Sequence, residues 1–278
     1  MKRIHKSSIS FDGLSRYILQ VAPGSPDDNW NSFADKNSTG KREVQKQLYK
    51  DQRGLCAYCE INIEPQILRK DFPGKGTADF RVEHFHPQSD SATRSPNKCS
   101  WGLDWHNMLA CCLGGDEATV FETSRFCEEE KHRHCDVPKG NNTLDGIILN
   151  PLTDVPPFPS LFDERSVAES PDEIILEPNQ DRCDSVSSNC YVKAQSTIRE
   201  LNLNCTPLNR FRHATLRRID NRIAELMKTG VNYDNALEAV MCEVFDDSSP
   251  TWPPFFTTIR AHYGIAAEKR LKEINYQG

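Results

Sequence analysis

The sequence predicts an α+β protein in which a metal-stapled module comes before a mostly helical region. Between about residues 55 and 142 the chain is rich in cysteine and histidine and has few long apolar periodic runs. A metal usually replaces a large apolar core in a module of this composition. After Ser188 the apolar residues recur at helical spacing, as at Ala194, Ile198 and Leu201.

The expected elements follow in chain order. Residues 1–40 are rich in turn-forming residues, which predicts an irregular N-terminal segment. A helix is expected over 41–54, because Gly54 supplies a stop. The alternating run 79–87 predicts a strand that ends at a proline, and 172–178 predicts a later strand. Helices are expected from Pro207, around 235–244 and up to about residue 274. The predicted organisation is therefore an N-terminal segment over 1–40, a module over 41–145 and a C-terminal region over 146–278.

Composition excludes several classes of protein. The chain has 278 residues, 11 cysteines and a net charge of −6. No apolar run approaches the roughly 18 residues that span a membrane, and no apolar segment follows the basic N-terminus, so a cytoplasmic protein without membrane contact is expected. An odd number of cysteines in that compartment indicates thiols, some of them metal ligands, instead of disulfides. The excess of acidic residues argues against a protein whose main function is to coat nucleic acid, but it is compatible with an enzyme that has a local basic groove.

Four cysteines are candidates for a structural zinc site. Cys56 and Cys59 have the C-x-x-C spacing that lets two thiolates reach one zinc ion from a tight turn. Cys112 and Cys135 complete a tetrahedral Cys₄ set, and Cys111 could take the place of Cys112. His132 and His134 could replace a thiolate, and ordinary buried thiols are the plainer alternative.

The order of these motifs resembles the HNH (ββα-metal) nucleases. Its segments are CAYC, VEHFHP, HNMLACC and HCDVPKG. A closer resemblance adds ILNPL and TIRELNLN and extends from Gly54 to Arg212. This order is similar to the retron- and Septu-associated HNH nucleases, the PtuB-type proteins. The resemblance implies a zinc-stapled ββα-metal HNH module followed by a partner-binding helical region.

The resemblance also implies roles for individual residues. His84 is expected to be the general base, and Glu83 and Asp136 are expected to hold a catalytic Mg²⁺ or Mn²⁺ through oxygen. Asn107 is expected to fix the loop that carries His84 or to orient its imidazole. Asp136 stands where the family usually has Asn or His, and a long insertion precedes Cys135. An alignment without that insertion would place Asp116 in the metal-binding position.

For several polar residues the sequence is compatible with more than one role. Lys139 is expected to contact the phosphate of nucleic acid, or to be an ordinary charged residue at the end of a short helix. His86 could contact nucleic-acid phosphate, join the metal ligands or do neither, and His106 is expected to pack beside Asn107. A basic stripe for phosphate or a partner, or a solvated helix face, is predicted from Arg210, Arg212, His213, Arg217, Arg218 and Arg222.

The function expected from this resemblance is metal-dependent cleavage of nucleic acid, with DNA favoured over RNA. The resemblance implies an anti-phage effector that works with an ABC-type ATPase of the PtuA kind, and with a retron reverse transcriptase and its msDNA as further partners. The alternative is a zinc-stapled, non-catalytic adaptor that recruits a partner. That alternative requires only the cysteines and gives no reason for Glu83, His84 and Asp136 to converge.

Overall fold

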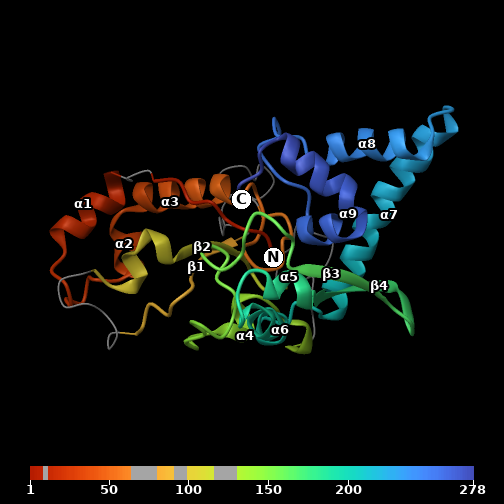
Figure 1. The fold of residues 1–278 in the computed structure, drawn as a ribbon. Coiled ribbons are helices and arrows are strands. Elements are labelled where there is room, and N and C mark those ends of the chain that lie inside the picture. The colour runs from red at the N-terminus through yellow and green to blue at the C-terminus, as the bar shows by residue number, and fades with distance from the viewer. Residues whose placement is uncertain (9–11, 64–79, 91–98, 116–129) are drawn as a thin grey trace.

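The protein combines helices with two small antiparallel sheets, which confirms the α+β class for the residues that the structure describes. The computed structural model describes residues 1–8, 12–63, 80–90, 99–115 and 130–278 (Figure 1). The strands are β1 (Phe80–His84), β2 (Met108–Cys112), β3 (Phe162–Val167) and β4 (Ser170–Pro178). β1 pairs with β2, and β3 pairs with β4.

Nine α-helices and three 3₁₀ helices lie in the described part of the chain. The α-helices are α1 (Asp12–Gln20), α2 (Trp30–Lys36), α3 (Ser38–Asp51), α4 (Asp136–Lys139), α5 (Gln180–Asp184), α6 (Cys190–Glu200), α7 (Thr206–Lys228), α8 (Tyr233–Val244) and α9 (Phe256–Glu273). The 3₁₀ helices are η2 (Trp101–Leu103), η3 (Trp105–Asn107) and η4 (Glu130–His132). None of these helices has both the length and the apolar character needed to cross a bilayer.

The prediction of an irregular N-terminal segment is wrong. The structure places α1, α2 and the start of α3 within residues 1–40. The polar residues that suggested turns are helix caps: the side chain of Asn29 accepts from the N–H of Ser32, and that of Asn37 accepts from the N–H of Gly40. The scattered apolar residues anchor these short helices, because Phe33 is fully buried.

The β1–β2 hairpin lies between the N-terminal helices and the rest of the molecule (Figure 1). Glu83 of β1 pairs with Leu109, and His84 pairs with Met108. Every residue of β2 is buried, whereas β1 has exposed and half-buried positions. β1 therefore presents polar side chains from a hairpin whose other strand is held in the core.

The main core includes residues on both sides of position 145, where the sequence suggested a boundary. Its buried members include Leu48, Leu109 and Cys135 as well as Leu149 and Leu208. A second core cluster is formed mainly by α7, α8 and α9. The predicted module over 41–145 and the region after it thus share one core.

The sequence block TIRELNLN supports the segment that leads into Cys135. The carbonyl of Leu201 accepts from the N–H of Cys135 at 2.9 Å, and the amide of Asn202 donates to the carbonyls of Lys131 and Arg133. Asn204 makes two hydrogen bonds with the backbone of Leu176 in β4. This block therefore joins the fourth predicted zinc ligand to the second sheet.

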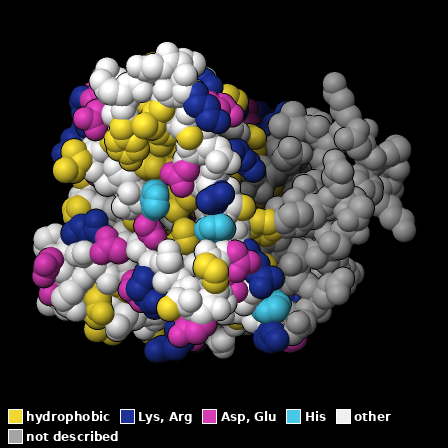
Figure 2. Space-filling model, turned by 90° about the vertical axis from the view of Figure 1, so that its right-hand side faces the viewer, with side chains coloured by type: hydrophobic (Ala, Val, Ile, Leu, Met, Phe, Trp, Pro, Cys, Tyr) yellow, Lys and Arg dark blue, Asp and Glu magenta, His cyan; other side chains and the backbone are white. Residues whose placement is uncertain are grey.

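The predicted basic stripe on α7 does not include Arg212, which is 1% exposed. Its guanidinium donates to backbone and side-chain oxygens, including the carbonyl of Leu203 at 2.6 Å. Arg222 is ion-paired with Glu243 at 2.8 Å. Figure 2 views the side of the molecule on which α7 and α8 lie, and acidic and basic side chains intermix there.

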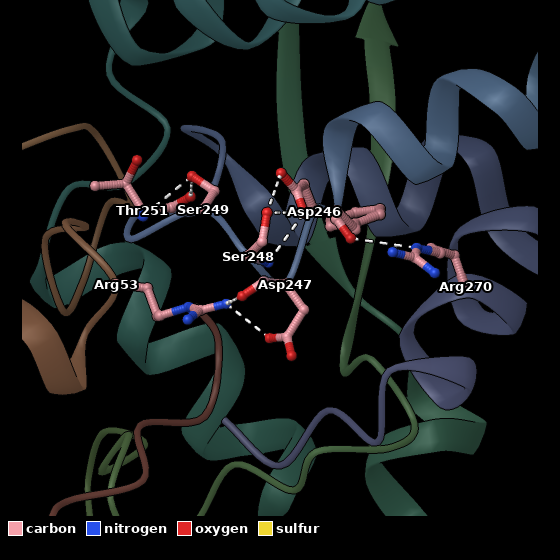
Figure 3. Close-up of polar contacts among 8 residues, drawn as sticks. Arg53, Asp246, Asp247, Ser248, Ser249, Thr251 and Arg270 are labelled. Carbon is pink, nitrogen blue, oxygen red and sulfur yellow. Dashed lines mark hydrogen bonds and ion pairs between the residues drawn. The ribbon is translucent and has the colours of Figure 1, made fainter.

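The loop after α8 contacts the turn that leads into the C-x-x-C segment. The guanidinium of Arg53 donates to the carbonyl and the carboxylate of Asp247, at 3.1 and 2.8 Å, and the Ser248 hydroxyl bonds to Asp246 (Figure 3). Gly54 has φ +74°, and a Cβ there would lie 2.7 Å from Cγ2 of Thr251. Glycine is therefore required for this turn to approach the loop closely.

Glu60 connects the C-x-x-C segment to the start of α9. Its carboxylate is buried, accepts hydrogen bonds from the N–H and the hydroxyl of Thr257, and lies 3.2 Å from the Met1 amino group. Burial alone would raise its pKa, but the Met1 charge and the Thr257 hydrogen bonds outweigh burial and lower the pKa below its ordinary value.

Replacing Glu60 by alanine is expected to lower the free energy of unfolding by about 3–5 kcal/mol, because the Met1 amino group and the Thr257 donors would be buried without the carboxylate that pairs with them. Urea unfolding measures this difference. Glu238 is the matched control: its ion pair with Lys269 is exposed, so Glu238→Ala should change stability by less than about 1 kcal/mol. Equal effects of the two substitutions would contradict the role of Glu60.

Candidate active site and metal centre

The structure brings the four predicted zinc ligands together. The sulfur atoms of Cys56, Cys59, Cys112 and Cys135 all lie within 4.8 Å of one another, and all four residues are buried. The N–H of Cys112 points to the sulfur of Cys56 at 3.3 Å, a contact that stabilises a thiolate. Burial raises the pKa of the Cys112 and Cys135 thiols well above the ordinary value, so four thiolates here require a bound cation. This donor set fits Zn²⁺.

Cys111 is a fifth thiol next to this group. Its sulfur lies 3.7 Å from that of Cys56, although the four-sulfur group contains Cys112. His134 is buried, and its Nδ1 lies 3.1 Å from the carbonyl of His132 and 3.9 Å from the sulfur of Cys205. The grouping of the sulfur atoms favours Cys112 over Cys111, and neither His132 nor His134 belongs to the group.

A cavity of about 240 Å³ is lined in part by Asp136, the residue that follows Cys135. It lies where β1, the loop after β1 and α4 meet. Its described lining residues are Arg81, Val82, Glu83, His84, Pro87, Gln88, Asp136, Lys139, Gly140 and Asn141. The cavity is therefore lined by four of the predicted site residues: Glu83, His84, Asp136 and Lys139.

His84 is buried and held in one orientation. Its Nε2 lies 3.1 Å from the carbonyl oxygen of Gly102, and its ring packs edge-on against Trp30. A carbonyl only accepts, so Nε2 carries the proton and Nδ1 is left to accept one. Burial, together with the smaller effect of the Lys139 and Lys6 charges, lowers the pKa of His84 to about 4. The imidazole is thus neutral at pH 7.

Sequence reasoning missed Gly102, which holds the imidazole through a backbone carbonyl. A Cβ at this glycine would lie 3.0 Å from the side-chain oxygen of Gln88 and 3.1 Å from the backbone nitrogen of Trp30. The glycine in the segment SWGLDW was the available signal, but its partner is 18 residues away in sequence.

Asn107 fixes the loop that follows β1. Its side-chain oxygen accepts from the N–H of His86 at 2.7 Å, and its amide donates to the carbonyls of His86 and Trp101, both at 2.9 Å. Of the two roles expected for Asn107, the structure shows the loop contact. His106 is exposed.

His86 lies between two carboxylates. Its Nδ1 is 3.0 Å from Asp145, its Nε2 is 3.0 Å from Asp90, and its ring packs against that of Trp101 at a tilt of 42°, with centroids 4.3 Å apart. Both ring nitrogens thus have protein partners in this structure. A phosphate contact by His86 would require one carboxylate to move.

The acidic residues of the cavity have cationic neighbours. Lys139 is 1% exposed, and its ammonium lies 2.8 Å from Glu83 and 3.1 Å from the carbonyl of His84. Arg81 lies 3.1 Å from Asp136. Burial raises the pKa of Glu83, and it raises that of Asp136 to about 7, with Glu83 adding to the effect at Asp136.

The carboxylates fit a hard divalent cation. Oδ1 of Asp136 is buried without a hydrogen-bond partner among the described residues. Carboxylate oxygen is the ligand that Mg²⁺ and Mn²⁺ prefer, and a cation here would stabilise the charged form that burial disfavours. Asp116, the alternative ligand, lies outside the described residues.

Replacing Asn107 by alanine is expected to lower the free energy of unfolding by about 3 kcal/mol, because it leaves one buried N–H and two carbonyls without partners. It should also reduce any catalysis that depends on the loop. Urea unfolding and substrate cleavage measure the two effects. Asn142→Ala, at an exposed asparagine, should change stability by less than about 0.5 kcal/mol. An Asn107→Ala protein as stable as Asn142→Ala would refute the loop role.

Sequence comparison relates the chain to a retron-associated protein. No protein-family model matches the chain. The chain is 29% identical over 232 residues to an Escherichia coli protein named "Retron Ec83 putative HNH endonuclease", and the match covers 80% of this chain and 81% of that protein. The chain is therefore similar to a retron-associated protein over most of both lengths.

Proposed function

We propose that this protein is a metal-dependent HNH endonuclease that hydrolyses phosphodiester bonds in nucleic acid. The observation that carries the proposal is the meeting of Glu83 and His84 from β1 with Asp136 from α4 in one cavity. The similarity to a retron-associated protein named as an HNH endonuclease supports it. In this interpretation β1, β2 and α4 form the ββα-metal module, and the four cysteines hold a structural zinc ion beside it.

The chemistry assigns a separate task to each side chain. Neutral His84 accepts the proton of the attacking water at Nδ1, while Gly102 holds Nε2. Asn107 keeps the loop after β1 in place. Glu83 and Asp136 would hold Mg²⁺ or Mn²⁺. When bound, such a cation neutralises charge on the phosphate and on the leaving oxygen.

The proposed biological setting is prokaryotic antiviral defence. The resemblance to PtuB-type proteins supports an ABC-type ATPase partner, and the retron-associated relative supports a reverse transcriptase and its msDNA. DNA is the proposed substrate. Lys139 contributes to nucleic-acid binding only if its ammonium leaves Glu83, which it neutralises in this structure.

The test is a substrate panel: duplex DNA, single-stranded DNA and total RNA, each with Mg²⁺ or Mn²⁺, with and without the ATPase. Cleavage of duplex DNA is expected, and cleavage confined to RNA would correct the substrate. If the zinc-loaded protein and its complex cleave none of the three, the adaptor alternative replaces the nuclease.

A further inference from the structure

Arg81 is a cation at the cavity that the proposed chemistry leaves without a role. Arg81 and Lys139 are the two cationic residues among its described lining. The side chain of Lys139 is 1% exposed and is ion-paired with Glu83, whereas that of Arg81 is 45% exposed. Arg81 is thus the cation that a polyanion can reach at the cavity without a rearrangement.

The strand geometry fixes the direction of this side chain. Arg81 and Glu83 are two residues apart on β1, so both point to the same face of the hairpin. Nη1 of Arg81 lies 3.1 Å from Oδ2 of Asp136, which is 5% exposed, and Nη2 lies 3.5 Å from the carbonyl of Leu113. The buried carboxylate therefore anchors one edge of an otherwise accessible guanidinium.

A guanidinium anchored in this way can donate hydrogen bonds to two anions at once. It has five N–H donors in a rigid plane, so donors that do not face Asp136 or Leu113 remain for a second oxyanion. Arginine forms two parallel hydrogen bonds with phosphate, which gives both affinity and orientation.

We infer that Arg81 binds a phosphate of the nucleic-acid backbone at the mouth of the cavity while it holds Asp136. This inference rests on the proposed nuclease function and names a substrate-binding residue for it. Arg81 would thereby place the phosphodiester against the carboxylates and His84, a task that buried Lys139 and carboxylate-bound His86 do not perform in this structure.

The experiment measures binding apart from cleavage. His84→Ala protein and the double variants His84→Ala/Arg81→Ala, His84→Ala/Arg81→Lys and His84→Ala/Arg222→Ala are titrated with fluorescent duplex DNA and with single-stranded RNA, in Mg²⁺ and in EDTA. Arg222 is a matched control, because its side chain is also 45% exposed and is paired with a carboxylate, but it lies on α7.

Loss of Arg81 is expected to weaken binding about tenfold or more, the effect of one charge-assisted hydrogen-bonded contact. The slope of log affinity against log salt should become shallower by about 0.9 for DNA. Arg81→Lys should restore the slope and only part of the affinity, and Arg222→Ala should change neither. In the His84-intact enzyme, Arg81→Ala should raise KM.

Unchanged affinity and salt slope in Arg81→Ala, or changes no larger than those in Arg222→Ala, would overturn the inference. If cleavage by the wild type persists and depends on His84, the nuclease proposal survives that outcome. If the proteins bind neither nucleic acid even at low salt, both the inference and the proposed function fail.

Discussion

Replacing Cys112 by serine is expected to release the zinc ion and to abolish cooperative unfolding of the module around β1 and β2. Structural Zn²⁺ contributes roughly 10–16 kcal/mol in small metal-dependent peptides, more than the total stability of many domains. Cys112 belongs to the group of four sulfurs within 4.8 Å of one another, and its own position is fully buried. Zinc content per chain and a thermal unfolding curve measure the effect.

The neighbouring cysteine provides the control. Cys111 is equally buried and also lies next to Cys56, so Cys111→Ser introduces the same chemical change one residue away. This variant should retain one zinc ion per chain and lose only about 1–3 kcal/mol from a buried hydroxyl. If Cys111→Ser loses zinc and Cys112→Ser keeps it, the assignment of the third ligand is reversed.

Replacing His84 by alanine is expected to reduce cleavage by about 10²–10⁴-fold, the usual contribution of a general base. The imidazole is neutral, lines the cavity and is fixed through Nε2, so its removal takes away the proton acceptor. The fall should appear in kcat with little change in KM, because the ring is not assigned to substrate binding. Single-turnover cleavage with Mg²⁺ measures it.

His106→Ala controls for the loss of an imidazole from the same region, since His106 is exposed and outside the cavity lining. It should cleave at the wild-type rate. His84→Ala must also retain its zinc and its unfolding midpoint, so that the loss is chemical and not structural. A folded, zinc-loaded His84→Ala protein that cleaves as fast as His106→Ala would remove His84 from the mechanism.

The sequence predicted those parts of the site that depend on local spacing. The pair Cys56 and Cys59 reflects one tight turn. The strand with Glu83 and His84 reflects the alternating run 79–87, although β1 covers only Phe80–His84 and ends before the proline. Cys112 and Cys135 come from distant segments, and the cysteine count predicts them as partners of that pair, with Cys111 as the alternative to Cys112. Motif order predicts Asp136, which lines the cavity with Glu83.

The remaining features depend on tertiary contacts that no local pattern encodes. The ion pairs of Lys139 with Glu83 and of Arg81 with Asp136 join residues 56 and 55 positions apart, and such pairing determines which cation is exposed. The asparagines Asn29 and Asn37 cap helices within a segment whose composition predicts turns, because caps and turns favour the same residue types. Arg212 lies in a sequence of charged helix residues, yet its guanidinium is buried and donates to the carbonyls of Ile174 and Leu203, which belong to other segments.

The most direct test of the central claim is DNA cleavage by zinc-loaded protein, in its complex with the ATPase, after weakly bound divalent cations are removed and Mg²⁺ is added back. We expect no cleavage without Mg²⁺ and restored cleavage when it is added. Asp136→Asn should lose that restoration, since Asp136 would hold the cation at the cavity that contains His84. Cleavage that needs no added cation, or that Asp136→Asn leaves unchanged, would contradict a metal-dependent nuclease site between β1 and α4.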